Sequence, residues 1–357
     1  MNVTFANDLS ALPERIPGPA AWYGPAMEAR TDWLEILTPA ESAEVAAATD
    51  RLAAGDVEIA AIRRNDFPLP KSAPRLSRIR RDVLGGRGFA LIRGVAIDPA
   101  DIRRAAIAFF GLGSYFGNAR PQNAQGHVLG HVRDLGRSSA DPNTRIYQTR
   151  ERQTFHTDSC DIVGLLCLKT AKKGGLSALV SAVTMYNEIR RSRPDLVPAL
   201  FAPIETDRRG EVAAGAKPYF RIPVFSWHAG LLSVIYQRQY IESARRFPDV
   251  ASLTPRQVEA LDLFDALAND ARLHMHMEFR PGDIQLVHNH TLLHDRTAFE
   301  DWPELSRKRH LLRLWLASPE ARPLPPVFAE RYGSVVPGER GGVVLSGARL
   351  NAPLSVD

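Results

Sequence analysis

The stretch QTFHTDSCDI, residues 153–162, places a histidine two positions before an aspartate. Alternate side chains of a β-strand point to the same side, so His156 and Asp158 share a face if this stretch is extended. An imidazole and a carboxylate on one face can bind a metal ion together. The pair alone is weak evidence, because polar side chains on strands normally alternate outward to solvent.

A third ligand lies in a later strand-like stretch, GDIQLVHNHTLLH, residues 282–294. Two histidines and one carboxylate form the facial triad of non-haem Fe(II) oxygenases, which leaves coordination positions open for other molecules. The third ligand has three candidates here, His294, His288 and His290. They differ by even numbers, so the phase of a strand does not separate them.

Two arginines occur in another strand-like stretch, RHLLRLWLA, residues 309–317. Arg309 and Arg313 share one face of such a strand. If that face is buried, each guanidinium group needs an anion, because an unpaired buried charge is very costly. The ordinary partner is a protein carboxylate such as Asp283 or Glu300. The alternative is a dicarboxylate co-substrate with one end on the metal and the other in a bidentate arginine clamp.

Four motifs in this order carry a resemblance to a known family: FHTD, GGLS, GDIQLVHNHTLLHDRTAFED and RKRHLLRLWL. They resemble the Fe(II)/2-oxoglutarate-dependent dioxygenases of the taurine dioxygenase and clavaminate synthase-like family, over roughly residues 85–330. By this resemblance the catalytic metal ligands are His156, Asp158 and His294. The step His294-Asp295-Arg296 matches the family motif and favours His294 over the other two histidines.

The resemblance also implies the cofactors: Fe(II), 2-oxoglutarate as co-substrate and O2, with ascorbate as a reductant in vitro. It implies that Arg309 and Ser177 bind the far carboxylate of 2-oxoglutarate and that Arg313 meets an acidic group of the substrate. Tyr147 and Gln148 precede the HTD motif and are further candidates for the substrate site. Arg150, Tyr236 and Arg238 are others, and surface positions without a role are the alternative for all of them.

The expected reaction is oxidation of a small polar substrate, which the modest positive charge allows to be anionic, with release of succinate and CO2. Hydroxylation is the default outcome, and desaturation or cyclisation by the same chemistry are alternatives. A zinc hydrolase could use the same ligands, but it leaves the two arginines unexplained. A catalytically inert jelly-roll binding protein would be expected to have lost part of the triad.

Strand patterns dominate the centre and the last third of the chain, and helix patterns the first third. Helices are expected to begin at Thr38, at Asp98-Pro99 and at Thr254, and the last of these has Val258, Leu261 and Phe264 as its apolar stripe. This distribution favours a mainly β antiparallel barrel with flanking helices, and the resemblance specifies a double-stranded β-helix, or jelly roll. The expected organisation is an N-terminal arm and helices (1–84), an oxygenase domain (85–330) with a helical insert at about 183–270, and a C-terminal extension (331–357).

The composition is that of a globular protein, with 357 residues, 45% hydrophobic and 24% charged, and a net charge of +5. The densest basic run, residues 75–87, has Leu76, Ile79 and Val83 at helical spacing, which predicts an amphipathic helix rather than a nucleic-acid site. No apolar run reaches the length of a membrane span. The N-terminus has no signal-peptide pattern, and Cys160 and Cys167 suit a core. A cytoplasmic protein is expected, acting on a small molecule without membrane or nucleic acid, with a homo-oligomer allowed.

Overall fold

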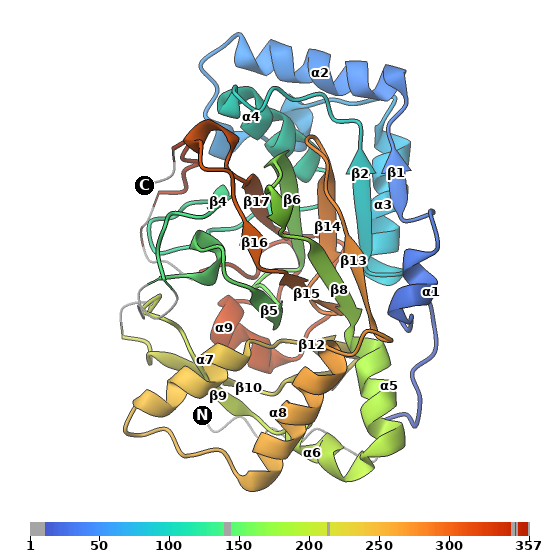
Figure 1. The fold of residues 1–357 in the computed structure, drawn as a ribbon, viewed down its shortest axis with the longest axis vertical. Coiled ribbons are helices and arrows are strands. Elements are labelled where there is room, and N and C mark those ends of the chain that lie inside the picture. Colours follow the sequence, from blue (N-terminus) through green and yellow to red (C-terminus); the bar gives the residue numbers. More distant parts are fainter. Residues whose placement is uncertain (1–10, 139–143, 213–214, 344–346, 348, 356–357) are drawn as a thin grey trace.

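The computed structural model describes residues 11–138, 144–212, 215–343, 347 and 349–355. Two β-sheets face one another in the middle of the molecule, and helices cover both ends and one side (Figure 1). The architecture is therefore mainly β with flanking helices, as the sequence predicts.

The larger sheet has the order β1-β2-β14-β6-β17-β3, and β4 pairs with β17. All pairs in this sheet are antiparallel except β1 with β2. The strands are β1 (Leu34–Ile36), β2 (Phe89–Arg93), β3 (Asn118–Ala119), β4 (Gly130–Val132), β6 (Ile162–Lys169), β14 (Ile284–His288) and β17 (His310–Ala317).

The smaller sheet has the order β13-β8-β15-β5, with every pair antiparallel. Its strands are β5 (Gln153–His156), β8 (Ser177–Ser181), β13 (His274–Met277) and β15 (Leu292–Arg296). A short ladder of β7 (Lys173–Gly174) with β16 (Phe299–Glu300) extends beside it. Because β5 and β15 are neighbours, the HTD motif and the HDR step lie side by side.

The α-helices are α1 (Gly24–Glu28), α2 (Pro39–Ala53), α3 (Ala73–Gly85), α4 (Ile102–Gly113), α5 (Ala182–Ser192), α6 (Val197–Phe201), α7 (Arg238–Ser243), α8 (Pro255–Ala268) and α9 (Ala329–Tyr332). Short 3-10 helices are η2 (Ile59–Ala61), η3 (Arg64–Asp66), η4 (Ile146–Gln148), η5 (Pro194–Leu196), η6 (Ala244–Arg246), η7 (Leu305–Arg307) and η8 (Pro326–Phe328). None of the helices in the described part of the chain is both long and apolar enough to cross a membrane.

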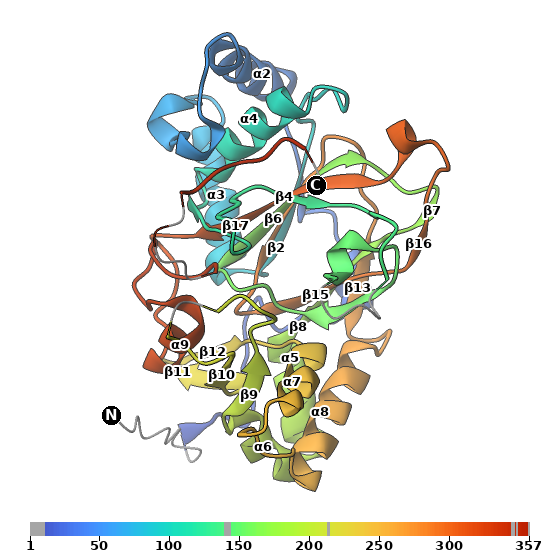
Figure 2. The same cartoon turned by 90° about the vertical axis from the view of Figure 1, so that its left-hand side faces the viewer.

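The chain between β8 and β13 forms a separate layer at the lower end of the molecule (Figure 2). It holds α5 to α8 and two hairpins, β9 (Ile204–Asp207) with β10 (Tyr219–Ile222) and β11 (Phe225–His228) with β12 (Leu231–Val234). A hydrophobic cluster fills this layer, with the Phe225 ring in contact with those of Tyr186 and Phe264. The domain limits expected from the sequence stay a prediction.

Strand β17 separates two hydrophobic clusters. Leu312, Leu314 and Leu316 pack with the N-terminal helices on the outer side of the larger sheet. Leu311 and Trp315 pack with Val163, Cys167 and Val287 between the two sheets. The alternation in RHLLRLWLA therefore predicts correctly which side chains face inward, and both cysteines are buried thiols.

Several helix predictions are confirmed in detail. Thr38 and Glu41 form the capping box of α2, and Thr254 and Gln257 form that of α8. The apolar stripe of α3, Leu76, Ile79 and Val83, is fully buried.

Other local predictions are wrong. The helix expected at Asp98-Pro99 begins only at Ile102, because Asp101 accepts the capping hydrogen bond from the Arg104 amide. Val258 is exposed, so the buried stripe of α8 uses Ala260, Leu261 and Phe264.

The stretch 282–294 is two strands rather than one. The chain leaves the larger sheet after His288, turns through Asn289–Thr291 and enters the smaller sheet at Leu292. Side chains before and after this turn belong to different sheets. The even spacing of the three histidines therefore does not put them on one face.

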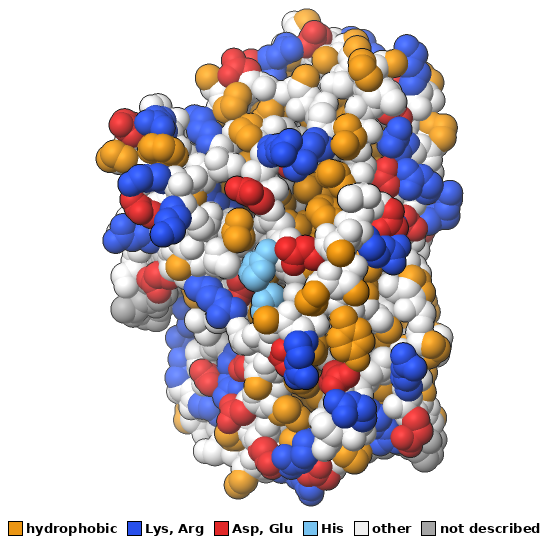
Figure 3. Space-filling model, turned by 45° about the vertical axis from the view of Figure 1, so that its right-hand side comes forward, with side chains coloured by type: hydrophobic (Ala, Val, Ile, Leu, Met, Phe, Trp, Pro, Cys, Tyr) orange, Lys and Arg blue, Asp and Glu red, His pale blue; other side chains and the backbone are white. Residues whose placement is uncertain are grey.

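Positive and negative side chains are mixed over the face shown in Figure 3, with no single basic patch on it. Part of the basic run in α3 is also neutralised locally. Arg78 forms a two-bond ion pair with Glu35, and Arg75 pairs with Glu41. This agrees with the interpretation of residues 75–87 as the polar side of a helix.

Candidate metal centre and its two cavities

His156 and His294 are direct cross-strand partners in the β5–β15 pair. Their ring centroids are 4.1 Å apart, and Asp158 follows in the loop after β5. The Nε2 atoms of the histidines lie 3.8 Å and 3.9 Å from the Asp158 carboxylate. One ligand atom from each residue lies within 4.8 Å of the other two, and this is the single such group of three found among the described residues.

The immediate surroundings of His156 suit a metal ligand. Its Nδ1 lies 2.8 Å from the Thr154 carbonyl oxygen, so Nδ1 carries the proton and donates it. This leaves the Nε2 lone pair facing Asp158, as in metal-binding histidines oriented by a backbone carbonyl. The Gln153 amide lies 2.8 Å from that same Nε2.

Asp158 is fixed from three sides. Its backbone N–H donates to Asn289 Oδ1, while Trp315 Nε1 and Arg313 Nη1 donate to its Oδ2 at 2.7 Å and 3.3 Å. Burial alone would raise the pKa of this carboxyl, but Arg313 and the two histidines lower it below its ordinary value. The aspartate is therefore ionised, which is the form that binds a metal.

Both candidate histidines are neutral near pH 7. Burial lowers the pKa of His294 to about 3, and burial likewise lowers the pKa of His156. Two neutral imidazoles and one carboxylate are a donor set that fits Fe(II) and also fits zinc.

His288, the last residue of β14, and His290, in the turn between the sheets, are not part of this group. His288 Nδ1 contacts Thr291 Oγ1 at 2.6 Å, and His290 Nε2 contacts Asp161 Oδ1 at 2.9 Å. Asp161 also pairs with Arg340 of the C-terminal segment at 2.8 Å. Both histidines thus have structural partners, and neither belongs to the group of three candidate ligands.

A cavity of about 470 Å³ opens on one side of the triad. His156, His294, Ser177 and Arg309 all line it. Arg309 is buried, and its Nη1 has no hydrogen-bond partner among the described residues. Burial lowers the pKa of Arg309 to about 10, so the group is still charged at neutral pH. In the described part of the chain no carboxylate lies within ion-pair distance of this buried cation, although Asp301 acts on it from further away.

The Gly174-Gly175 turn allows this arginine to fit. Both glycines have positive φ, and a Cβ on Gly175 would lie 2.9 Å from Arg309 Nε. A side chain there would push the guanidinium group away. Ser177, two residues on, places its Oγ 3.1 Å from Gln285 Oε1 at the cavity wall.

Sequence reasoning missed a second buried arginine in this cavity. Arg296 also lines it, and its Nε and Nη1 have no hydrogen-bond partner among the described residues. Phe299 separates the two cations, with its ring centroid 5.0 Å from Arg296 Cζ and 5.2 Å from Arg309 Cζ. The HDR step contains Arg296, but this motif was used only to distinguish His294 from the other two histidines.

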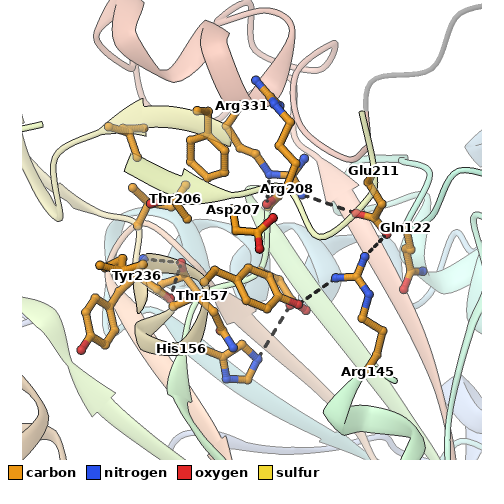
Figure 4. Close-up of a pocket in the computed structure, with 18 of the residues that line it drawn as sticks. Gln122, Arg145, His156, Thr157, Thr206, Asp207, Arg208, Glu211, Tyr236 and Arg331 are labelled. Carbon is orange, nitrogen blue, oxygen red and sulfur yellow. Dashed lines mark hydrogen bonds and ion pairs between the residues drawn. The ribbon is translucent and has the colours of Figure 1, made fainter. Parts of the chain in front are cut away.

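A larger cavity of about 860 Å³, counting its opening to solvent, also borders the triad (Figure 4). His156 and Asp158 line it together with Tyr147, Arg313 and Tyr236. His156, Tyr147 and Arg313 line both cavities. The triad therefore stands where the two cavities meet.

Arg313 lies in the interior, but its partner differs from those expected. It pairs with Asp158, donates from Nε to Gln122 Oε1 at 2.7 Å, and places its Cζ 4.8 Å from the Tyr147 ring centroid. The carboxylates suggested from the sequence are engaged elsewhere: Asp283 pairs with Arg93 and Glu300 with Lys172.

Of the remaining candidates for the substrate site, some line a cavity and others do not. Tyr147 and Tyr236 line the larger cavity, and the Tyr236 hydroxyl donates to Asp265. Gln148 lines neither cavity and caps η4 by accepting from the Arg145 amide. Arg150 is exposed, and Arg238 is held by Glu242, Asp262 and Asp265. Arg145, Glu211 and Arg331 of the larger cavity were not foreseen, because nothing in their local sequence marks them.

Residues 49–315 match the family described as "Taurine catabolism dioxygenase TauD, TfdA family". The chain belongs to this family. Among its relatives, FR-33289 synthase of Streptomyces rubellomurinus (strain ATCC 31215) is 30% identical over 323 residues, covering 88% of this chain and 94% of that protein. The taurine hydroxylase-like protein SAT17 of Stachybotrys chartarum (strain CBS 109288 / IBT 7711) is 31% identical, covering 82% and 77%. A uridine-5'-phosphate dioxygenase of an Amycolatopsis species is 26% identical, covering 66% and 86%.

Solved structures share the fold of this TauD/TfdA family member. Asparagine oxygenase in complex with Fe(II), 3-hydroxyasparagine and succinate superimposes with a TM-score of 0.63 at 18% identity, covering 80% of this chain and 93% of that one. The non-heme iron oxygenase OrfP in complex with Fe and alpha-ketoglutaric acid gives 0.61 at 17% identity, covering 79% and 93%. The fold is the mainly β jelly roll of these oxygenases, and the protein is an Fe(II)/2-oxoglutarate-dependent dioxygenase.

Proposed function

We propose that this enzyme hydroxylates a small, polar, anionic organic substrate, with conversion of 2-oxoglutarate and O2 to succinate and CO2. His156, Asp158 and His294 would hold Fe(II), which supplies the oxidising chemistry when it is bound together with 2-oxoglutarate and O2. Arg309 and Ser177 would hold the far carboxylate of 2-oxoglutarate. Arg313 and Tyr147 would meet the substrate.

One observation carries this proposal: the triad stands at the junction of two cavities, and the smaller one contains an uncompensated buried arginine. A buried guanidinium group is stable only with an anion beside it. A dicarboxylate that reaches from the triad to Arg309 supplies that anion, and the bidentate geometry of arginine suits a carboxylate. The larger cavity then remains for the substrate, on the other side of His156.

The side chains of the chain itself would bind and orient the reactants. The Thr154 carbonyl keeps the proton of His156 on Nδ1, and Trp315 and Asn289 fix the direction of Asp158. The apolar walls of the smaller cavity, Val163, Leu165 and Leu311, keep water from the co-substrate. Arg313 contacts Asp158 and lines the larger cavity, so it would contact both the bound substrate and a metal ligand.

The names of two relatives support an anionic substrate. Taurine, in the name of the Stachybotrys protein, carries a sulfonate, and uridine-5'-phosphate carries a phosphate. The alternative of an inert binding protein is not favoured, because the triad is complete and its aspartate is ionised, as a metal site requires.

The test is a screen of small anionic molecules for stimulated succinate release in the presence of Fe(II), ascorbate, 2-oxoglutarate and O2. Mass spectrometry of the substrate then separates the outcomes: gain of one oxygen means hydroxylation, and loss of two hydrogens means desaturation or cyclisation. A protein that releases no succinate with Fe(II), with or without substrate, but hydrolyses an ester or amide with zinc, would overturn the proposal.

A further inference from the structure

One wall of the larger cavity is built from three distant parts of the sequence. Arg145 precedes η4, Arg208 and Glu211 follow β9, and Arg331 belongs to α9. We call these four residues the arginine wall. None of them is a member of the candidate metal triad.

Glu211 lies between two guanidinium groups (Figure 4). Its Oε1 is 2.7 Å from Arg145 Nη2, and its Oε2 is 4.0 Å from Arg331 Nη2. Neutral groups hold both arginines in place: Arg145 Nη1 donates to the Tyr240 hydroxyl and Arg331 Nε donates to Ser159 Oγ. The two guanidinium groups are therefore positioned before any ligand arrives.

The arginine wall is largely shielded from solvent. Relative exposures of the side chains are 9% for Arg331, 12% for Glu211 and 19% for Arg145. Burial raises the pKa of Glu211, even though three arginines act against that shift. Burial also lowers the pKa of Arg208 and of Arg331. The shifts of Arg208 and Arg331 mark charges that are incompletely compensated, whereas Tyr240 and Glu211 outweigh burial at Arg145 and raise its pKa.

The charges that line the cavity do not balance. Asp158 is occupied by Arg313, and Asp207 accepts from Ser243 and pairs at 3.1 Å with Arg246, which does not line the cavity. Glu211 is then the carboxylate left to face the guanidinium groups of Arg145, Arg208 and Arg331. Over all described lining residues, four arginines meet three carboxylates, an excess of one positive charge; with Asp207 assigned to Arg246 outside the cavity, the excess at the arginine wall is two.

We propose that the arginine wall binds a phosphate ester or phosphonate group of the substrate, and that the Glu211 carboxylate occupies this place in its absence. The inference rests on the proposed function, because it names the substrate class of the same site. A phosphoryl group carries up to two charges near neutral pH and matches the excess, whereas a carboxylate or sulfonate carries one. Planar guanidinium groups also bind phosphoryl oxygens in pairs.

The position of the arginine wall gives the substrate a direction. Figure 4 shows Arg331 and His156 on opposite sides of the pocket. Phe220, Ile222 and Val224 line the same cavity and offer apolar contact. A molecule anchored by its phosphoryl group would extend its carbon part along this surface toward the triad.

Binding of small probes tests the proposal without knowledge of the natural substrate. Calorimetry would measure the affinity of methylphosphonate and methyl phosphate, with methanesulfonate and acetate for comparison, at a pH where the phosphonate carries two charges. The enzyme is kept anaerobic with Fe(II) and saturating 2-oxoglutarate, so that the co-substrate site is filled. We expect either phosphorus compound to bind more tightly than both comparison anions. The tighter of the two distinguishes an ester from a phosphonate.

Variants then assign the binding to the arginine wall. Arg145→Gln and Arg331→Gln should each weaken methylphosphonate binding at least about tenfold, the factor for one lost charge-assisted hydrogen bond. Glu211→Gln should tighten it, because the competing carboxylate is gone. Arg221→Gln is the matched control: Arg221 lies between Phe220 and Ile222 on β10 but points outward, where it pairs with Glu205. It should bind as the wild type does.

Two results would overturn the proposal. One is acetate or methanesulfonate binding as tightly as the phosphorus compounds; the other is unchanged affinity in both arginine variants. If those variants fail to fold, Glu211→Gln decides, since a gain of affinity cannot come from damage and its absence contradicts the proposal. Succinate release by the wild type without substrate is measured in parallel. If the wild type releases no succinate, the proposed dioxygenase reaction is contradicted. Phosphonate binding would then stand as a separate result.

Discussion

Arg313 and Asp158 form an ion pair, with Nη1 3.3 Å from Oδ2, in which both side chains are 8% exposed. Arg313 lines both cavities, and Asp158 is the candidate metal ligand between them. Binding of an anion to Arg313 therefore acts on the same carboxylate that faces the two histidines. This pair is the shortest connection between the substrate side and the metal side of the site.

The first prediction concerns Arg313. Arg313→Gln should reduce substrate-stimulated succinate release by at least about tenfold, because a buried charged contact is lost. Arg313→Lys keeps a charge beside Asp158 and should retain iron at one equivalent with a partial loss of stimulation. The measurement is succinate release with and without the substrate found by the screen. Normal stimulation of Arg313→Gln would limit Arg313 to the support of Asp158.

The second prediction concerns the metal ligands. Replacement of His156, Asp158 or His294 by Ala should abolish turnover and sharply weaken iron binding, since three ligands are needed to hold the ion. His288→Gln is the control, because that histidine contacts Thr291 in the turn between the sheets. Iron content after gel filtration gives the answer. Stoichiometric iron in His294→Ala together with loss of iron in the His288 variant would show that the third ligand is misassigned.

A third prediction separates the two arginines of the smaller cavity. Arg309→Lys keeps the charge but loses the planar fork, so the KM for 2-oxoglutarate should rise about tenfold, the factor for one lost charged hydrogen bond. Iron affinity should change less. Arg296→Lys is the companion variant, because Arg296 stands on the other side of Phe299. A raised KM in the Arg296 variant alone would transfer the carboxylate contact to Arg296.

The fourth prediction concerns stability in acid. Burial and the neighbouring His131 lower the pKa of His310 to about 3, whereas a histidine in an unfolded chain has a pKa of about 6.5. Between these two pKa values, His310 is protonated in the unfolded chain but neutral in the folded protein. The free energy of unfolding should therefore be constant above pH 6.5 for this group, and fall below it by up to about 1.4 kcal/mol per pH unit.

Urea unfolding at pH 8 and pH 5 checks this effect. His310→Gln removes the titrating group, so its stability should depend less on pH than that of the wild type, even if it is lower at pH 8. His228→Gln, in the β11–β12 hairpin, is the control. An equal loss of stability on acidification in the wild type and in His310→Gln would show that His310 does not contribute.

The sequence predicts β17 well because its alternation is strict over the whole strand, and each side is buried against a different cluster. It predicts the outline of the site because the motifs that carry it are local. The turn at Asn289–Thr291 escapes detection, since HNHT continues a strand-like pattern without glycine or proline. The pairing of Arg313 with Asp158 also escapes, because which carboxylate meets a buried arginine depends on long-range packing.

The arginine wall was even harder to predict from the sequence than the pairing of Arg313. Arg145, Glu211 and Arg331 come from three segments with no shared motif, and only the folded chain brings them together. Arg331 lies outside the stretch that carries the family resemblance. Its place on the wall follows from the way α9 packs against β10, and that contact leaves no periodic signal in the sequence.

The position of β17 has a consequence for synthesis of the chain on the ribosome. This strand lies inside the larger sheet, between β6 and the short strands β3 and β4, and Arg340, further on, neutralises the buried Asp161. Strands β2, β6 and β14 leave the ribosome earlier but have no complete sheet to join until residue 317 has emerged. Folding of the oxygenase core is thus delayed until β17 has been synthesised, as expected for a topology dominated by distant contacts. A nascent chain released before this point would expose the apolar edge of β6 to chaperones and proteases.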